Sequence, residues 1–375
     1  MRFIHTSDWH LGKSLKGQSL LDDQAHILNE ILRAVDDQKA EALIIAGDIY
    51  DRSVPPAEAV ELLNEVLLKI VERKVPILCV AGNHDGAKRL NFGSQLFERS
   101  QFYLRTPIRA DDEPIIFNDQ YGEIYFSLLP YFEPAQIRNA FDIDDNLTFD
   151  GAGKIFIDNA RSKIPRGTRS VAISHAFITG GERSDSETQN VGGADNVSAA
   201  HFDGYNYVAL GHLHKPQVMG SNVIRYSGSP LKYSFDEWQH HKGILSVEVG
   251  AKGEAYTDFL PLTPKHDLIV IDDLMENILR LPPTNDYVAV RLLDRTNVLH
   301  VREKLSAQFP NLLSVEKIGF KQEATLNAGF KRVEGVTVLD QFKDFFKHQT
   351  GEGLSAEEEA ALIECLQELR KEEGE

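Results

Sequence analysis

Short apolar runs recur along the first part of the chain, and polar residues follow each run at once. These runs cover residues 2–6, 42–46, 75–81, 170–174 and 207–210. Continuous apolar runs of this length are typical of strands buried in a parallel sheet. Apolar residues repeat at helical spacing over 21–35 and 57–71, and Pro55-Pro56 suits the start of the second helix. With further strands over 223–226 and 243–249, the pattern predicts an α/β domain of sandwiched sheets flanked by helices.

The pattern changes after Pro261-Leu-Thr-Pro264, which predicts a linker. Beyond it, the sequence predicts a small α/β domain with strands over 267–271, 287–293 and 313–318 and helices over 274–281 and 298–309. Residues 179–196 are rich in glycine, serine and acidic residues, and they predict a partly ordered surface loop.

The end of the chain predicts two short helices. One has an apolar stripe and ends at Gly351, and the other begins with the capping box Ser355-x-x-Glu358. The stripes consist of Val338, Leu339, Phe342, Phe345 and Phe346 in the first helix and Leu362, Ile363, Leu366 and Leu369 in the second. Two explanations remain open, since these stripes either dock on their own chain or enter a groove of a partner.

Side chains that bind metals follow the apolar runs. The clusters are Asp8-x-His10, Gly47-Asp48, Gly82-Asn83-His84-Asp85, Ser174-His175 and Gly211-His212-x-His214. Sites in open α/β sheets form beyond the carboxyl ends of the strands, so we expect these clusters to meet. Imidazole and carboxylate ligands together suit Mn, Zn or Fe better than Mg or Ca. The glycines before the ligands allow sharp turns and a close approach to the backbone.

Each cluster alone has a plainer explanation. Asp-x-His and Gly-Asp are common in turns, and His175 alone would be a hydrogen-bonded core histidine. Their joint occurrence, in order and at strand ends, predicts a site for two metals that can hydrolyse a phosphodiester. Gly12-Lys13-Ser14 looks like the end of a P-loop, but Ser7 stands where that motif needs glycine, so we expect no ATP hydrolysis.

The clusters together resemble the calcineurin-like metallophosphoesterase superfamily. Three segments, 1–12, 47–56 and 226–235, look like the SbcD family of bacterial nuclease subunits, which work with the SMC-family ATPase SbcC. The resemblance is strong over about residues 1–260 and rests on organisation alone beyond them. It implies a nuclease domain over 1–264, a capping domain over 265–325 that helps to bind DNA, and C-terminal helices over 326–375 that bind the base of the SbcC coiled coil.

The resemblance also implies roles for the site residues. Asp48 would bridge two divalent cations, with Mn²⁺ preferred. Asp8, His10 and His214 would complete one coordination shell, and Asn83, His175 and His212 the other. His84 would act on the phosphate, and Asp85 would orient His84. We assign Asp51 no catalytic step, because archaeal and eukaryotic relatives often have histidine there and an aspartate cannot replace it in proton transfer at neutral pH.

The activity implied is that of a Mn-dependent double-strand exonuclease and single-strand or hairpin endonuclease. It would act with an SbcC-like ATPase on DNA ends and hairpins in repair, recombination and replication. A homodimer within a heterotetramer, near the nucleoid in the cytoplasm, is the expected assembly. Two alternatives stay open, a phosphatase or phosphodiesterase for small molecules and a non-catalytic scaffold. The intact metal clusters argue against the scaffold, and residues 227–230 and 265–375 argue against the small-molecule enzyme.

Composition agrees with this interpretation except in charge. The chain has 375 residues, 42% of them hydrophobic, and a net charge of −17, which is unusual for a DNA-binding protein. Much of the acid is local, at the C-terminal end and in two loops. Candidate phosphate contacts are Lys13, Lys16, Arg52, Lys88, Arg89 and Lys232. Cys79 and Cys365 suit a reducing compartment, and we expect no signal peptide and no membrane span.

Overall fold

The computed structural model describes residues 1–187, 195–295, 298–318, 338–351, 353–356, 358–363 and 366. The chain forms two compact units, Met1–Leu268 and Ile269–Glu375. The first unit ends close to the predicted linker, and it contains all the predicted metal clusters. The division of the rest into a capping domain and partner-binding helices stays a prediction.

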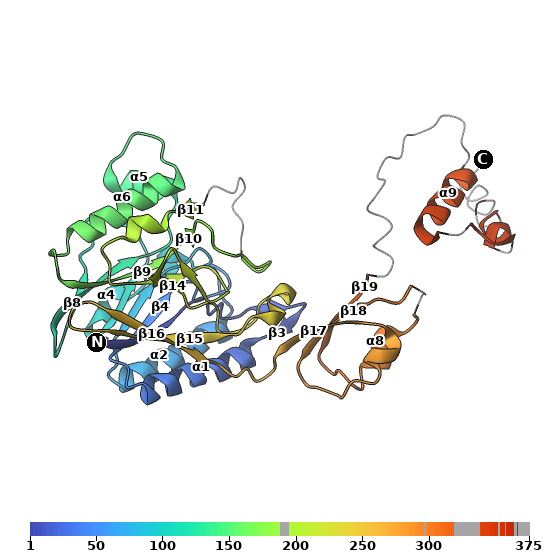
Figure 1. Ribbon diagram of the computed structural model, residues 1–375, viewed down its shortest axis with the longest axis horizontal. Coiled ribbons are helices and arrows are strands. Elements are labelled where there is room, and N and C mark those ends of the chain that lie inside the picture. The colour runs from blue at the N-terminus through green and yellow to red at the C-terminus, as the bar shows by residue number, and fades with distance from the viewer. Residues whose placement is uncertain are drawn as a thin grey trace. The chain divides into compact units, whose positions relative to one another are not determined.

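The first unit contains two six-stranded sheets (Figure 1). The strand order in the first sheet is β16-β15-β1-β4-β5-β6. Strands β1, β4, β5 and β6 run parallel, and β15 and β16 extend the sheet in antiparallel pairing. The bounds are β1 (Arg2–Thr6), β4 (Ala42–Ala46), β5 (Ile77–Val80), β6 (Phe102–Arg105), β15 (Gly243–Val249) and β16 (Ala255–Pro261).

The second sheet has the order β13-β14-β12-β9-β8-β7. Its four central strands are parallel, and antiparallel strands close both edges. The bounds are β7 (Ile115–Asp119), β8 (Gly122–Leu129), β9 (Arg169–His175), β12 (Tyr207–Gly211), β13 (Gln217–Met219) and β14 (Ser221–Tyr226).

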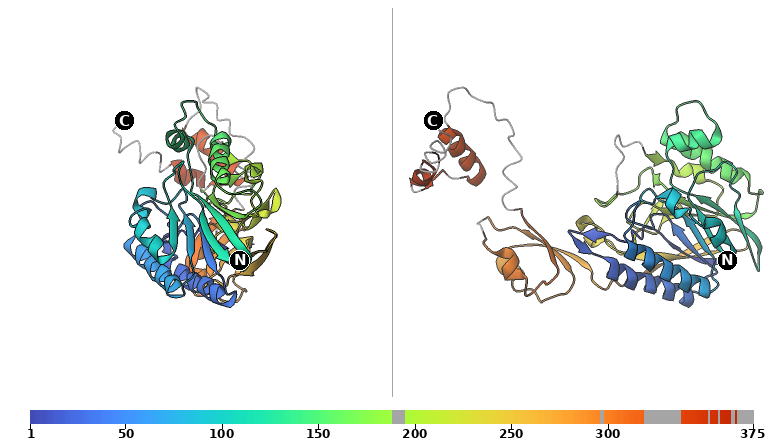
Figure 2. Two further views of the ribbon diagram at one scale, coloured as in Figure 1. Left: turned by 90° about the vertical axis from the view of Figure 1, so that its left-hand side faces the viewer. Right: turned by 180° about the vertical axis from the view of Figure 1, so that it is seen from behind.

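Helices cover the outer faces of both sheets. The pair α1 (Leu21–Asp37) and α2 (Ala57–Glu72) lies on the first sheet, and the pair α5 (Pro134–Phe141) and α6 (Phe149–Ser162) lies on the second (Figures 1 and 2). The predicted α/β sandwich with flanking helices is therefore confirmed. Shorter elements are β2 (Ser14–Leu15), β3 (Gln18–Ser19), α3 (Ala87–Leu90), α4 (Ser94–Phe97), η1 (Glu98–Ser100), β10 (Phe177–Ile178), β11 (Asn196–Val197), η2 (Ala199–Phe202) and η3 (Phe235–Gln239).

An apolar core joins the two sheets. The ring of Phe3 on β1 lies 5.9 Å from the ring of Phe126 on β8 and 5.8 Å from that of Tyr207 on β12. His5 is buried in the same layer, where its ring nitrogens pair with Tyr207 Oη at 3.0 Å and Leu210 O at 3.1 Å. Burial lowers the pKa of His5 to about 3, so His5 is a neutral core residue. This packing brings the carboxyl ends of strands from both sheets to one edge.

The second unit contains a three-stranded sheet, β17 (Leu268–Asp273), β18 (Tyr287–Leu292) and β19 (Leu312–Lys317), in that order. All three predicted strands are confirmed. The helices α7 (Met275–Ile278) and α8 (Val301–Leu305) are shorter than predicted. Beyond each helix the chain continues as single turns, in which Leu281 N–H donates to Ile278 O and Phe309 N–H donates to Leu305 O.

The C-terminal pattern also predicts structure correctly where the residues are described. Helix α9 (Val338–Thr350) ends at Gly351, whose φ of +76° suits glycine. The capping box forms, since Glu358 N–H donates to Ser355 Oγ and Ser355 N–H donates to Glu358 Oε2 at 2.8 Å. Leu369, Cys365 and residues 319–337 lie outside the described residues. Among the helices that are described, none has the length and apolar character of a membrane span.

Candidate metal centre

Backbone hydrogen bonds join the loops that carry the first two clusters. Asp8 N–H donates to Gly47 O and His10 N–H donates to Asp48 O, both at 3.0 Å. Asp8, His10 and Asp48 have positive φ values of 53°, 45° and 48°. Such values are unusual for residues other than glycine and store strain that the surrounding structure must support. This left-handed backbone conformation directs the three side chains toward the edge where the strands end.

Two glycines make room for neighbouring site residues. Gly47 has φ +92°, and a Cβ there would lie 2.3 Å from Nδ1 of His175. A Cβ on Gly82 would lie 2.1 Å from Oδ1 of Asp48. The glycines therefore serve less to admit a metal than to let side chains from different strands pass each other.

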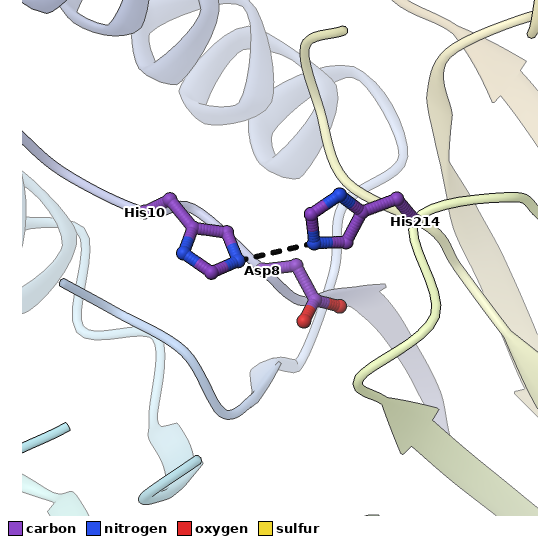
Figure 3. A group of neighbouring side chains, drawn as sticks. All are labelled: Asp8, His10 and His214. Atoms are coloured by element: carbon purple, nitrogen blue, oxygen red, sulfur yellow. Dashed lines mark hydrogen bonds between the residues drawn. The ribbon is translucent and has the colours of Figure 1, made fainter. Parts of the chain in front are cut away.

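The first pocket consists of Asp8, His10 and His214, which the structure brings together as predicted (Figure 3). Their ligand atoms all lie within 4.8 Å of one another, and all three residues are buried. Nε2 of His10 and Nε2 of His214 face each other at 3.1 Å. The backbone N–H of His212 donates to both oxygens of Asp8 at 3.1 and 3.2 Å, which holds that carboxylate at the pocket.

The second pocket consists of Asn83, His175 and His212. Oδ1 of Asn83 lies 2.9 Å from Nε2 of His175 and 2.9 Å from Nδ1 of His212. Nδ1 of His175 pairs with the carbonyl of Ala46 at 2.9 Å, so this nitrogen carries the proton and Nε2 presents its lone pair. An amide oxygen and two imidazole nitrogens thus converge on one point.

Asp48 lies between the two pockets. Its Oδ2 is 3.5 Å from Nε2 of His10 and 3.5 Å from Nε2 of His175. Its other oxygen accepts the backbone N–H of His84 at 2.9 Å. The cluster is compatible with a binuclear metal site, because it offers two sets of nitrogen and oxygen ligands that share one carboxylate.

These side chains are better suited to binding divalent cations than to forming hydrogen bonds only with one another. At most one of two facing imidazole nitrogens can donate to the other, whereas a cation between them would satisfy both lone pairs. The charges are also coupled. Burial alone would raise the pKa of Asp48, but His175 holds it well below its usual value. Burial lowers the pKa of His175, yet Asp48 raises it to about 9. Without a cation, Nε2 of His175 therefore holds a second proton whose charge offsets Asp48, and a bound cation would replace that proton.

His84 and Asp85 lie on the loop after β5. Nδ1 of His84 pairs with the backbone carbonyl of Asp51 at 2.9 Å. The carboxylate of Asp85 accepts the backbone N–H groups of Gly82 at 2.8 Å, Tyr50 at 3.0 Å and Ile49 at 3.2 Å. Asp85 thus ties the loop after β4 to the loop after β5. Its expected action on the His84 ring stays a prediction.

Asp51 and the nearby cations form a small network beside the first pocket. Nζ of Lys13 lies 2.9 Å from Oδ1 of Asp51, and Nδ1 of His10 lies 3.7 Å from the same oxygen. Arg52 is largely exposed, with Nε 3.5 Å from the other oxygen of Asp51. Lys232, another candidate phosphate contact, pairs with Asp267 at 2.8 Å.

Sequence reasoning missed a layer of residues behind His214. Glu237 and Lys242 form a buried ion pair at 2.5 Å, and Oε1 of Glu237 lies 3.2 Å from Nδ1 of His214. Glu187 accepts the backbone N–H of His214 at 2.6 Å, and Ser186 Oγ lies 2.7 Å from the same ring nitrogen. No local signal marks these residues, since they lie in segments that appear as polar loops in the sequence.

Comparison with known proteins shows the family of this chain. The family model described as calcineurin-like phosphoesterase matches residues 1–216. The chain is 33% identical to the SbcD subunit of the SbcCD nuclease of Staphylococcus epidermidis (strain ATCC 12228 / FDA PCI 1200), over all of both chains. A search of solved structures finds TT1561 of Thermus thermophilus, at 10% identity and a TM-score of 0.37, over 69% of this chain and 98% of that one. The chain therefore belongs to the calcineurin-like phosphoesterases and, within them, to the SbcD family of nuclease subunits.

Proposed function

We propose that this chain is the nuclease subunit of a DNA end-processing complex and hydrolyses phosphodiesters by a two-metal mechanism, with Mn²⁺ preferred. Family membership supports a metal-dependent nuclease. The finer activities are a double-strand exonuclease and a single-strand or hairpin endonuclease. One observation carries the two-metal part of the proposal, the equal 3.5 Å separations of Asp48 Oδ2 from His10 Nε2 and His175 Nε2.

The two proposed ligand groups are those that the family resemblance implies, and the distances within the two pockets support them. Asp8, His10, Asp48 and His214 would hold one cation, and Asp48, Asn83, His175 and His212 would hold the other. When bound, two such cations polarise a phosphodiester and supply hydroxide near neutral pH.

His84 and Asp85 have separate roles in this proposal. Nδ1 of His84 pairs with the carbonyl of Asp51, and we assign Nε2 the contact with a phosphate oxygen or with the leaving group. Asp85 keeps the His84 loop in place through three backbone N–H groups.

A direct assay tests the proposal. Purified chain with Mn²⁺ is incubated with labelled linear duplex, hairpin and closed circular DNA, with and without an SbcC-like ATPase. We expect cleavage of ends and hairpins, stimulation by the ATPase with ATP, and loss of activity with EDTA. Hydrolysis of a small phosphodiester without cleavage of any DNA would favour the small-molecule alternative, and inactivity toward both would favour the scaffold.

The proposal also covers the second unit and the C-terminal tail, residues 326–375. We propose that residues 265–325 form the capping domain that helps to bind DNA and that residues 326–375 bind the SbcC-like ATPase. Phe342 and Phe345 on α9 are 42% and 47% exposed, which supports a partner for this helix.

Deleting residues 335–375 tests the role of the tail. The metal residues all lie before residue 215, so we expect a folded, metal-loaded chain that still cleaves simple phosphodiesters in Mn²⁺. Association with the ATPase and ATP-stimulated cleavage of duplex ends should be lost. A pull-down in which the shortened chain binds the ATPase with unchanged affinity would refute the partner role of residues 335–375 and favour their docking on their own chain.

An exposed apolar surface supports the proposed homodimer. Val60 on α2 and Phe92, Leu96 and Phe97 around α4 are 45%, 85%, 64% and 40% exposed. Val60, Phe92 and Phe97 line a hollow of about 370 Å³ between α2 and the α3–α4 segment. Contiguous apolar surface of this kind usually marks an interaction site, and in a homodimer it would bury itself against its own copy.

A charged substitution in this surface should separate the dimer. Phe92→Glu would place a carboxylate in the apolar contact, so we expect the mass measured by light scattering to fall to that of the monomer. Tyr256→Glu is the matched control, because Tyr256 is 64% exposed on edge strand β16. If Phe92→Glu leaves a dimer intact, the interface lies elsewhere.

A further inference from the structure

We propose that the two metal positions bind unequally, and that Glu237 is a positioning residue that makes the first pocket the tighter one. The inference rests on the two-metal function proposed above. It concerns which position stays loaded when metal is scarce.

The ligand sets of the two pockets differ in charge. Beside the shared Asp48, the first pocket has the carboxylate of Asp8, which is fully buried. The second pocket has the neutral amide of Asn83 in the corresponding role. The number of charged ligands is a main determinant of how tightly a protein site holds a divalent cation. The first pocket should therefore bind more tightly on charge alone.

A carboxylate also stands behind a histidine of the first pocket. Since Nε2 of His214 faces His10, its Nδ1 points away from the pocket and carries the proton. Nδ1 lies 2.7 Å from Ser186 Oγ and 3.2 Å from Glu237 Oε1, and the Ser186 hydroxyl donates to the same carboxylate oxygen at 2.5 Å. A carboxylate in this position fixes the ring orientation and tautomer and makes the ligating nitrogen more basic.

Further contacts prevent Glu237 from turning away. The side chain has no exposed surface, and it accepts hydrogen bonds from Lys242 Nζ at 2.5 Å and Ser234 Oγ at 2.9 Å. Lys242 also donates to the backbone carbonyl of His214 at 2.8 Å. One buried ion pair thus holds both the ring and the backbone of the same ligand.

The histidines of the second pocket have weaker support. His175 donates to a backbone carbonyl, that of Ala46, which has no net charge. Within the described part of the chain, the buried Nε2 of His212 has no hydrogen-bond partner, and neither has the buried Nδ1 of His10 in the first pocket. The difference in support between the two pockets therefore comes from Glu237 behind His214. The second pocket therefore lacks both the extra charged ligand and the charged support, and we expect its cation to exchange more readily.

A metal titration of the full purified chain tests this inference without relying on activity. Free Mn²⁺ is measured by its electron paramagnetic resonance signal as Mn²⁺ is added. The wild type should show two classes of site, one tight and one weak. Glu237→Gln should weaken the tight class by about 10–100-fold, the usual effect of losing such support, and leave the weak class unchanged. Asn83→Asp should tighten the weak class, because it adds the missing charge.

Two further variants control for damage to the fold. Glu237→Gln leaves Lys242 buried without its partner, so Glu237→Gln/Lys242→Met removes both charges and should show the same weakened class. Asp119→Asn breaks another buried ion pair, that of Asp119 with Arg169 at 2.6 Å, without touching a predicted ligand, and it should keep both classes.

Two results would overturn the inference. One is two equal classes in the wild type, and the other is a folded Glu237→Gln protein with an unchanged isotherm. The proposed function fails separately, since a chain with two unequal Mn²⁺ classes that cleaves no DNA would contradict the nuclease and leave this inference standing.

Discussion

Replacing Asp48 with asparagine is expected to empty at least one metal position and abolish nuclease activity. Oδ2 of Asp48 lies 3.5 Å from a histidine nitrogen of each pocket, so one substitution affects both. An amide removes the shared negative charge and presents an N–H₂ group, which cannot coordinate a cation, or a single neutral oxygen. Metal content by mass spectrometry and cleavage of labelled duplex in Mn²⁺ measure the two effects.

Asp36→Asn is the matched control for this experiment. Asp36 is an exposed carboxylate on α1 that pairs with Arg73 at 2.9 Å, so its loss should change neither metal content nor activity. Full activity of Asp48→Asn with two bound metals would exclude Asp48 as the bridging ligand.

Replacing His84 with alanine should separate chemistry from metal binding. His84 is anchored through Nδ1 on the carbonyl of Asp51, and we expect its other nitrogen to act on the phosphate. Turnover should fall by about 10²–10⁴-fold, the usual loss when a general acid or base is removed. The metal content should stay at the wild-type value.

The position of His84 also allows it a different role, that of a metal ligand. Ligand atoms of His10, Asp48 and His84 lie within 4.8 Å of one another, so these residues form a possible metal-binding group of their own. A His84→Ala protein with one position emptied would make His84 a ligand. His201→Ala controls for the loss of a histidine, because His201 pairs with Asp150 at 2.8 Å and belongs to no predicted pocket.

Local pattern determined much of the fold. The apolar runs at 42–46 and 207–210 lie within β4 and β12, and the stripe at 21–35 lies within α1. These signals work because burial of one face or of both faces imposes a period on the sequence. For the second unit, the same pattern predicts helices that are too long, because the apolar spacing continues into single turns after Ile278 and Leu305.

The identity of the clustered site residues also came from the sequence alone. Asp8, Asp48 and His175 each follow or end a strand, and parallel strands bring such ends to one edge. Family resemblance then divided them into two ligand groups, and the structure brings together the members of each group. Whether each residue binds metal stays a prediction that the variants above test.

Only the tertiary structure decided what supports these residues. Glu237 and Lys242 reach His214 from a 3₁₀ turn and the residues after it, and Asp85 turns toward the backbone of a different loop. Such contacts join segments distant in sequence, and no periodicity or motif encodes them. The sequence by itself thus determined which strands form and which side chains stand at their ends. The packing of one sheet on the other decided how those side chains are held, because a buried polar group takes whatever partner the fold brings within hydrogen-bond reach.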